Sequence, residues 1–299
     1  MAKLLEGKVA VVTGAGRWIG RGEALAFAEA GAQVVVNDLG GAGDGTGSDT
    51  APAQQVVEEI KALGGEAVAS TDSVAEMDGA ENIIQAAIDA FGRIDILVNN
   101  AGILRDKMVF NMSDEEWDIV LKVHLYGHFY CTRAATKHMR EQKWGRIINT
   151  SSTAGLASGF GQANYGAAKE GIIGLTRNVA RDMAKYNVTC NAIRPTAASR
   201  LTLNPDLIAA WERAGRTGSK ERVEANQADD IAPFILFLCT DSASNISGRT
   251  FDVVSGQISL YSEPIPEKTI FKKGKWTLEE LMDIAPGTLG RGLEVRGIA

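Results

Sequence analysis

Three polar residues in the middle of the chain, Ser152, Tyr165 and Lys169, have the types and spacing that proton transfer requires. Tyr165 and Lys169 are four positions apart, so on a helix their side chains would lie on one face. A phenol has a pKa of roughly 10, and a neighbouring ammonium group stabilises the phenolate and lowers that pKa. Tyr165 could then remove the proton of a hydroxyl group whose oxygen is held by Ser152. A Tyr and a Lys at this spacing also occur by chance in many helices, so oxidation of a secondary alcohol is predicted only if the rest of the chain supplies a hydride acceptor.

A glycine-rich segment near the N-terminus has the spacing of a phosphate-binding turn. Gly14, Gly16 and Gly20 follow an apolar run and lead into a helical pattern, so the first amides of that helix would be open to a phosphate. Asp38 ends the next apolar run, where a carboxylate can accept both ribose hydroxyls of NAD and would repel the extra phosphate of NADP. Either feature alone has a structural explanation, but together they predict an NAD site.

The elements that must position these residues follow a regular pattern, in which short apolar runs alternate with longer segments of helical periodicity. This alternation predicts βαβ units around a parallel sheet buried on both faces. Seven strands are predicted, over residues 8–13, 33–38, 66–70, 94–98, 146–150, 188–193 and 250–254. Helices are predicted near residues 18–30, 51–63, 78–91, 113–139, 163–185 and 228–239. The fold class is therefore α/β, a doubly wound Rossmann fold with a seven-stranded parallel sheet flanked by helices.

Two further groups of residues follow predicted strands at the edge of the sheet where such folds bind ligands. Asp72 and Ser73 follow the third strand and either meet the adenine edge of a nucleotide or, in the case of Asp72, cap the next helix. Asn99, Ala101 and Gly102 belong to a compact turn after the fourth strand. We expect both groups to contact a bound dinucleotide.

Three segments depart from the alternation. Residues 40–50, rich in Gly, Asp, Ser and Thr, are either a flexible surface connection or a loop that folds onto a bound nucleotide. Residues 196–227 are expected to form a movable cover over the site. We predict a dinucleotide-binding and catalytic domain over residues 1–255 and a C-terminal extension over residues 256–299, packed on the domain or on a partner subunit. In the extension, Lys272, Lys273 and Lys275 beside Trp276 either meet the phosphates of CoA or belong to a solvated tail.

Composition argues against several classes of protein. The 299-residue chain has a formal net charge of −6 with scattered Lys and Arg, which disfavours a nucleic-acid partner. Cys131, Cys190 and Cys239 lie far apart without CxxC spacing, so neither a disulfide framework nor a metal site is expected. No apolar run is long enough to span a bilayer, and the N-terminus does not look like a signal peptide. We expect a cytoplasmic enzyme with a small-molecule substrate.

Together these motifs resemble the short-chain dehydrogenase/reductase family, over about residues 5–254. The resemblance combines the glycine segment, Asp38, the Asn-Asn-Ala-Gly turn that ends at Gly102, and Ser152 placed thirteen positions before the Tyr165 of a YxxxK pattern. Four shorter segments are similar to the (3R)-hydroxyacyl-CoA dehydrogenase branch, found in peroxisomal multifunctional enzymes and also known as hydroxysteroid dehydrogenases. They are residues 37–41, 99–106, 123–125 and 161–165.

This resemblance implies an NAD-dependent oxidoreductase whose substrate is a 3-hydroxyacyl-CoA-type thioester, with a hydroxysteroid or a cholesterol side-chain acyl-CoA as the alternative. It also implies that Lys169 grips the ribose and that long helices form a homodimer or homotetramer. The catalytic residues are predicted to be Ser152, Tyr165 and Lys169. The predicted cofactor-binding residues are Gly14, Gly16, Trp18, Ile19, Gly20, Asp38, Asp72, Ser73, Asn99, Ala101, Gly102, Tyr165, Lys169, Pro195 and Thr196.

Three positions depart from the family pattern. Trp18 stands where the family has a glycine, so an indole lies where the backbone normally passes close to the cofactor. His124 replaces an asparagine and belongs either to a proton relay or to the buried core. Thr196 replaces the glycine after Pro195 and could donate a side-chain hydrogen bond to the nicotinamide amide. Trp18 and Thr196 also keep open a different class of protein, a non-catalytic nucleotide-binding protein.

Overall fold

The computed structural model describes residues 3–157, 159–198, 203, 208–209 and 219–293. Its central sheet has eight strands, β1 (Val9–Thr13), β2 (Gln33–Asn37), β3 (Ala67–Ser70), β4 (Ile96–Asn99), β5 (Gly145–Thr150), β6 (Val188–Thr196), β7 (Thr250–Val254) and β8 (Gln257–Leu260). They lie in the order β3-β2-β1-β4-β5-β6-β7-β8, with β8 antiparallel to β7 and all other neighbours parallel. The chain winds outward from β1 to β3 and then returns to β4, so a ligand crevice is expected between the carboxyl ends of β1 and β4.

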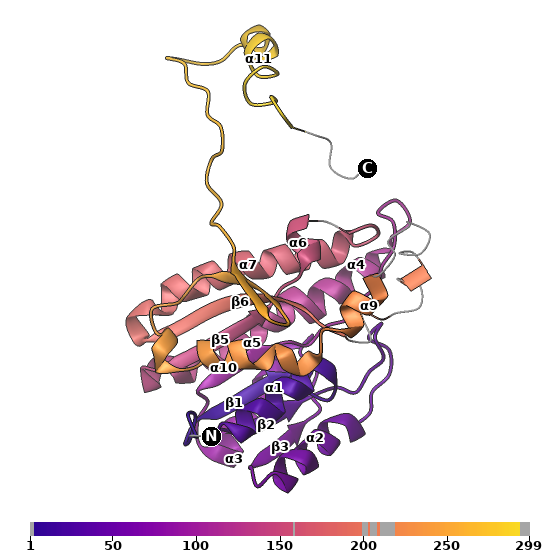
Figure 1. Cartoon of the computed structure of the whole chain (residues 1–299), viewed down its shortest axis with the longest axis vertical. Coiled ribbons are helices and arrows are strands. Elements are labelled where there is room, and N and C mark those ends of the chain that lie inside the picture. The colour runs from indigo at the N-terminus through magenta and orange to yellow at the C-terminus, as the bar shows by residue number, and fades with distance from the viewer. Residues whose placement is uncertain (1–2, 158, 199–202, 204–207, 210–218, 294–299) are drawn as a thin grey trace. The chain divides into compact units, whose positions relative to one another are not determined.

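Helices cover both faces of the sheet (Figure 1). On one face lie α1 (Trp18–Glu29), α2 (Ala51–Ala62) and α10 (Ala232–Leu238), and on the other α3 (Met77–Phe91), α5 (Gly127–Gln142) and α7 (Ala163–Met183). The shorter helices are α4 (Asp114–Leu121), α6 (Thr153–Ala157), α9 (Ser219–Glu224) and α11 (Leu278–Ile284). A π-helical turn, η1 (Lys122–Tyr126), and three 3₁₀ turns, η2 (Ala184–Tyr186), η3 (Ala228–Asp230) and η4 (Asp241–Ala243), lie between these elements.

The core consists of two apolar layers, one on each side of the sheet. Because side chains alternate along a strand, Val9 and Val11 of β1 enter the layer beneath α3, α5 and α7, whereas Ala10 and Val12 enter the layer beneath α1, α2 and α10. All five residues of β1 are buried, which explains its continuous apolar sequence. Burial on both faces holds the carboxyl ends of the central strands in fixed positions.

The structure refines two of the predicted elements. The helix predicted over residues 113–139 is present as α4, the π turn and α5, and its start is fixed by a capping box between Ser113 and Glu116. The Glu116 amide donates to Ser113 Oγ at 3.1 Å, and the Ser113 amide donates to Glu116 Oε2 at 2.9 Å. The predicted seven strands are joined by an eighth, β8, which follows the turn at Gly256.

Contacts divide the chain into two units, Met1–Tyr261 and Ser262–Ala299. The division lies beyond the predicted boundary after residue 255, because β8 pairs with β7 and belongs to the sheet. In the second unit, Thr277 caps the start of α11, and Lys272 forms a salt bridge with Glu280. One of the three lysines predicted to reach CoA therefore has a carboxylate partner within its own unit, and contact with CoA stays a prediction.

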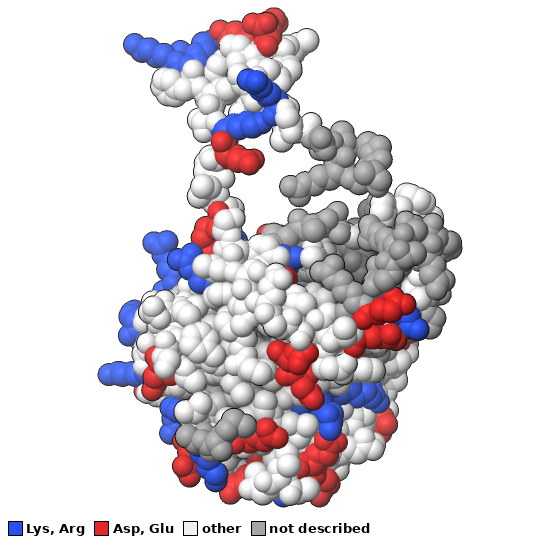
Figure 2. All heavy atoms as spheres, viewed as in Figure 1, with Lys and Arg blue, Asp and Glu red and all other residues white. Residues whose placement is uncertain are grey.

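Acidic and basic side chains are mixed on the face of the molecule shown in Figure 2.

On the helix that runs through α4, the π turn and α5, three aromatic side chains are partly exposed, with exposed fractions of 38% for Trp117, 48% for Tyr126 and 42% for Phe129. Such a surface suits the subunit contact expected of the long helices. The structure holds one chain, so the homodimer or homotetramer stays a prediction.

Glu23 is an uncompensated carboxyl group in the core. It lies on the buried side of α1, is fully buried, and has no hydrogen-bond partner for either carboxylate oxygen among the described residues. Burial raises the pKa of Glu23 from 4.5 to about 8. The folded chain therefore keeps this proton up to about pH 8, whereas the unfolded chain loses it near pH 4.5. Between these values the unfolded chain binds fewer protons, so Glu23 lowers stability as pH rises.

Glu23→Gln should therefore stabilise the protein at pH 8 by an amount on the order of a few kcal/mol relative to its effect at pH 5. Thermal unfolding of the variant and the wild type at both pH values measures this difference. Glu29→Gln, at the exposed end of the same helix, is the matched control and should show no such pH dependence. An equal shift of Tm at pH 5 and pH 8 for Glu23→Gln would show that the carboxyl group is not the cause.

Candidate active site

A cavity of ≈420 Å³ opens at the carboxyl ends of the central strands. Strands β1, β2, β4, β5 and β6 each end at or beside residues that line it, as expected for a doubly wound sheet. Most of the predicted site residues lie in its wall: Gly14, Trp18, Ile19, Gly20, Asp38, Asp72, Ser73, Ala101, Gly102, Ser152, Tyr165, Lys169, Pro195 and Thr196. Two predicted residues, Gly16 and Asn99, do not line it.

The glycine turn between β1 and α1 forms one end of the cavity. A Cβ atom on Gly20 would lie 2.3 Å from the carbonyl oxygen of Gly14, and one on Gly14 would lie 2.7 Å from Cα of Ala101, so both positions require glycine. No side chain caps the N-terminus of α1, and its first residues, Trp18 and Ile19, line the cavity. Uncapped amides at the start of a helix bind phosphate well, so this end fits the pyrophosphate of a dinucleotide.

Trp18 adopts a backbone conformation that normally needs glycine. Its φ is +50°, in the left-handed region, which costs a residue with a side chain roughly 1–2 kcal/mol. The chain therefore keeps the shape of the turn in spite of the substitution. The indole is 44% exposed and forms part of the cavity wall. The indole of Trp18 therefore changes the shape of the cavity wall beside the start of α1. The backbone at Trp18 keeps the left-handed conformation that a glycine would adopt.

Asp38 is fixed by two backbone amides at the end of β2. Gly16 donates to its Oδ2 at 2.8 Å and Gly40 donates to its Oδ1 at 2.7 Å. A Cβ on Gly16 would lie 2.8 Å from the same Oδ2, so Gly16 orients Asp38, and its predicted contact with the cofactor stays a prediction. Asp72 does not cap α3, which begins after Glu76, and instead Asn82 Nδ2 donates to its Oδ1 at 3.1 Å.

The turn after β4 adds two residues that sequence analysis missed. Asn99 is buried inside the sheet, where its Nδ2 donates to Asn149 Oδ1 at 2.9 Å, and its predicted contact with the dinucleotide stays a prediction. Its neighbour Asn100 lines the cavity and donates through Nδ2 to the carbonyls of Thr13 and Gly14 at 3.0 and 3.1 Å. Thr13 Oγ1 in turn accepts from the Asn100 amide at 3.0 Å. The asparagine pair was visible in the sequence, but which member faced the cavity depended on strand register.

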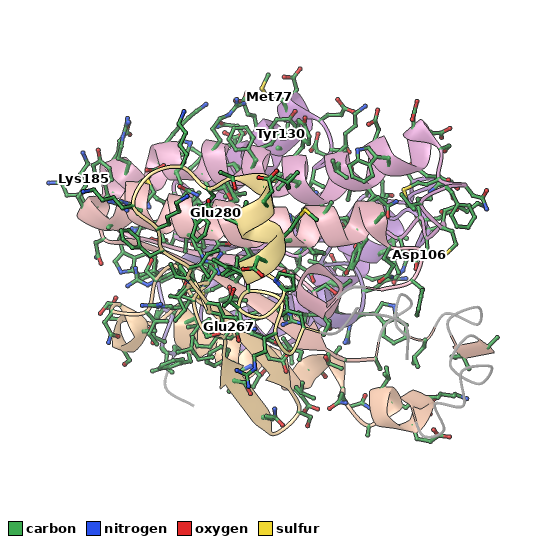
Figure 3. The ribbon with its side chains drawn as sticks, turned by 90° about the horizontal axis from the view of Figure 1, so that it is seen from above. Met77, Asp106, Tyr130, Lys185, Glu267 and Glu280 are labelled. Atoms are coloured by element: carbon green, nitrogen blue, oxygen red, sulfur yellow. The ribbon has the colours of Figure 1, made fainter. Side chains whose placement is uncertain are left out.

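Ser152, Tyr165 and Lys169 meet at the other end of the cavity. Ser152 follows β5, whereas Tyr165 and Lys169 share one face of α7, with Lys169 Nζ 5.4 Å from the centre of the Tyr165 ring. Lys169 Nζ donates to the Thr150 carbonyl at 2.6 Å, and Ser151 Oγ donates to the Lys169 carbonyl at 2.8 Å. The end of β5 therefore holds the start of α7 in place. Asp106 lies near this end of α7 and Lys185 beyond its other end (Figure 3).

Burial opposes the charged forms of both residues on α7. It lowers the pKa of Lys169 from 10.5 to about 7. Burial also raises the pKa of Tyr165 from 10.0 to about 12, against a hydrogen bond with Ser152 that lowers it. In the protein by itself the pKa of Tyr165 is therefore raised, and the expectation that Lys169 makes the phenol acidic beside a docked nicotinamide stays a prediction. Burial therefore disfavours the charged form of each side chain in the protein by itself.

His124 packs edge-on against Tyr165 from the π turn. The ring centres are 5.1 Å apart at an interplanar angle of 86°, and His124 Nε2 lies 2.8 Å from the Ile103 carbonyl oxygen. Burial, and secondly the charge of Lys169, lower the pKa of His124 well below 6.5, so its ring is neutral. A Cβ on Gly102 would lie 2.5 Å from His124 Cε1, so that glycine makes room for the ring. His124 thus positions the phenol and the segment after β4.

The remaining predictions about the site concern its cover, metals and membranes. Most of the cover predicted over residues 196–227 lies outside the described residues. The described residues bring together no group of three or more His, Cys, Asp or Glu side chains that could hold a metal ion. None of the helices in those ranges combines the length and apolar character that a bilayer span requires.

Comparison with known proteins agrees with this geometry. A family model described as short chain dehydrogenase matches residues 8–204. The chain is 48% identical over 256 residues to peroxisomal multifunctional enzyme type 2 of Mus musculus, which covers 85% of this chain and 32% of that enzyme. It is 41% identical over 295 residues to a hydroxyacyl-CoA dehydrogenase of Mycobacterium tuberculosis, covering 93% of this chain and 87% of that one. A crystal structure of a short chain dehydrogenase from Mycobacterium avium superposes with a TM-score of 0.81 at 41% identity and 96% coverage of both chains.

The chain spans about a third of the length of the mouse enzyme and most of the length of the mycobacterial proteins. The family model covers more than half of the chain. The matched region includes the glycine turn, Asp38 and the predicted catalytic residues Ser152, Tyr165 and Lys169. This chain belongs to the short-chain dehydrogenase family: it is an oxidoreductase that acts on CH–OH donors with a nicotinamide dinucleotide, and it is close to the hydroxyacyl-CoA dehydrogenases.

Proposed function

We propose that this chain oxidises the hydroxyl group of a 3-hydroxyacyl-CoA-type thioester to a ketone, with NAD as the hydride acceptor. The observation that carries this proposal is the convergence of Ser152, Tyr165 and Lys169 on the cavity whose opposite end is formed by the glycine turn and Asp38. A dinucleotide that extends from the glycine turn would bring its nicotinamide toward Tyr165. The names of two relatives, a hydroxyacyl-CoA dehydrogenase and a peroxisomal multifunctional enzyme, support the substrate class.

The proposed reaction assigns one task to each of the three residues. Ser152 donates a hydrogen bond to the substrate oxygen, and Tyr165 Oη removes the hydroxyl proton. Lys169, when protonated, stabilises the phenolate that results. When bound, the oxidised dinucleotide supplies the hydride acceptor and one positive charge. Because burial holds the pKa of Tyr165 at about 12, the positive charge that a bound oxidised dinucleotide would supply would favour the phenolate near neutral pH.

NAD is proposed over NADP because of Asp38. Its carboxylate lies at the end of β2, in the cavity wall, and the Gly16 and Gly40 amides fix its orientation. A carboxylate in this position accepts ribose hydroxyls and repels a phosphate on the same ribose.

The apolar part of the cavity wall fits an acyl thioester. Ile103, Ile119, Val123 and Val223 line the same cavity and supply apolar surface that suits an acyl chain. A hydroxysteroid or a cholesterol side-chain acyl-CoA would also find apolar contacts, and these are the alternative substrates. A protein that binds the nucleotide without catalysis is the alternative of a different class.

Steady-state kinetics with NAD and three kinds of alcohol separate these alternatives. We expect kcat/KM to be highest with straight-chain 3-hydroxyacyl-CoA thioesters, lower with a cholesterol side-chain hydroxyacyl-CoA, and lower still with a free hydroxysteroid. A preference for the free steroid would replace the proposed substrate. Tight NAD binding in calorimetry without turnover of any of the three would support the non-catalytic alternative.

Tyr165→Phe should lower kcat by about 10²–10⁴-fold, because the base is lost while the aromatic ring remains to pack against His124. NAD affinity, measured by calorimetry, should change little. Tyr186→Phe, in the 3₁₀ turn after α7, is the matched control and should retain full activity. Hydride transfer near the wild-type rate in Tyr165→Phe would refute the assigned base.

Asp38→Asn should reduce the preference for NAD over NADP by at least about tenfold, because it keeps the side-chain shape and removes the charge that repels the extra phosphate. Dissociation constants of both dinucleotides measure the effect. Asp78→Asn, exposed in the first turn of α3, changes the net charge equally and should leave the preference unchanged. If Asp38→Asn binds both dinucleotides with the wild-type preference, Asp38 does not select the cofactor.

A further inference from the structure

Residues 40–50, between β2 and α2, form a loop with a closed neck. The Asp49 amide donates to the Leu39 carbonyl at 3.0 Å, which joins the two ends of the loop. Gly40 lies between them with φ +76°, and a Cβ there would lie 1.8 Å from the Asp49 carbonyl oxygen. Loops of this length whose ends meet are Ω-loops, which pack as compact bodies on a protein surface.

The interior of the loop is held by its own hydrogen bonds. The Ala42 amide donates to the Thr46 carbonyl at 2.8 Å, and Asp44 Oδ1 accepts from the Thr46 amide at 3.0 Å and the Thr46 hydroxyl at 2.7 Å. The loop is therefore an ordered unit, unlike the flexible connection that its composition also allowed. It can move as a whole about the neck without losing these internal bonds.

The tip of the loop is fastened to the opposite side of the cavity. The Leu104 amide donates to the Gly43 carbonyl at 3.0 Å, and Arg105 Nε donates to the Asp44 carbonyl at 2.6 Å. A Cβ on Gly45 would lie 3.0 Å from Ile103 Cδ1, so the loop packs closely on that side chain. The loop starts after β2 and residues 103–105 follow β4, and β1 with its glycine turn lies between these strands. The loop thus crosses the nucleotide end of the cavity.

The loop also forms part of the cavity wall. Gly41, Ala42 and Gly45 line the cavity together with Ile103, and Arg17 Nη1 lies 3.4 Å from the Gly41 carbonyl oxygen. The loop therefore covers part of the nucleotide end. Few bonds hold the tip compared with the interior, so opening at residues 103–105 is the easiest route.

We propose that residues 40–50 are a lid over the dinucleotide site, that Arg105 is its latch, and that the opening of this lid sets the rate at which the dinucleotide is exchanged. Opening breaks the bonds from Leu104 and Arg105 and keeps the neck at Leu39 and Asp49. The proposal rests on the dinucleotide cofactor of the family and is independent of the proposed substrate. In many enzymes the movement of such a cover, and not the chemical step, limits turnover.

The release rate of reduced dinucleotide from the whole protein tests the latch. Titrations with NADH and NADPH first identify the tighter ligand, and stopped-flow fluorescence then follows its release when excess oxidised dinucleotide is added. Arg105→Ala should release the ligand about tenfold faster than the wild type, as expected for the loss of a charged hydrogen bond. Arg105→Lys, which keeps the charge without the Nε donor, should also release it faster. No substrate is present, so an error in the proposed substrate does not affect the result.

Lys107→Ala is the matched control, because Lys107 is a cation two positions away whose side chain pairs with Glu116 and does not contact the loop. Its release rate should stay within about twofold of the wild type. Hydrogen exchange of the Leu104 amide in the ligand-bound protein should become faster in Arg105→Ala and not in Lys107→Ala. Equal release rates in Arg105→Ala and the wild type would overturn the proposal. Equal acceleration by Lys107→Ala would also overturn it, since charge and not the latch would then be the cause.

Discussion

The hydrogen bond from Lys169 Nζ to the Thr150 carbonyl is the contact on which the catalytic site depends. It fixes a buried ammonium group beside the Tyr165 ring and connects the end of β5 to α7. Burial has a cost for both groups, because it lowers the pKa of Lys169 to about 7 and raises the pKa of Tyr165 to about 12. Burial therefore disfavours the charged form of each group in this pocket. In our account the phenolate forms when a second positive charge arrives with the dinucleotide, so that proton removal is coupled to the presence of the hydride acceptor.

The sheet brings this pair to the nucleotide end through its strand order. The chain reverses direction across the sheet between β1 and β4, and the two strand ends are joined by Asn100, Thr13 and Gly14. These hydrogen bonds fix the glycine turn relative to the segment after β4. His124 contacts both that segment, at the Ile103 carbonyl, and the ring of Tyr165. The same segment carries Arg105, which fastens the loop over the cavity. One short stretch of chain therefore contributes to cofactor binding, to the position of the base and to the closure of the site.

Much of this arrangement could be predicted from the sequence, because it depends on short-range patterns. Continuous apolar runs located the parallel strands, and the spacing of Tyr165 and Lys169 placed them on one helical face. Features that depend on exact register or packing were missed. The sequence contained both Asn99 and Asn100, but only the register of β4 decides that the first is buried and the second lines the cavity. Burial also reversed the expected shift in the pKa of Tyr165, since the depth of a side chain cannot be counted from spacing.

At Trp18 the backbone has the conformation that the family pattern predicts for a glycine, although the residue is not glycine. The turn still has the left-handed conformation that favours glycine, and the chain accepts its cost. The loop over residues 40–50 shows the converse, since a composition typical of flexible segments forms an ordered body with its own hydrogen bonds.

The ionisation of Tyr165, followed directly, tests the central claim. Tyrosine labelled with ¹³C at Cζ gives a separate NMR titration curve for each of the five phenols in the chain, and comparison with a chain lacking Tyr165 assigns its signal. Our account predicts that this phenol stays protonated to well above pH 10 in the protein alone and titrates at least two pH units lower when the protein is saturated with NAD⁺, as an added charge nearby requires. The same titration curve with and without NAD⁺ would contradict it.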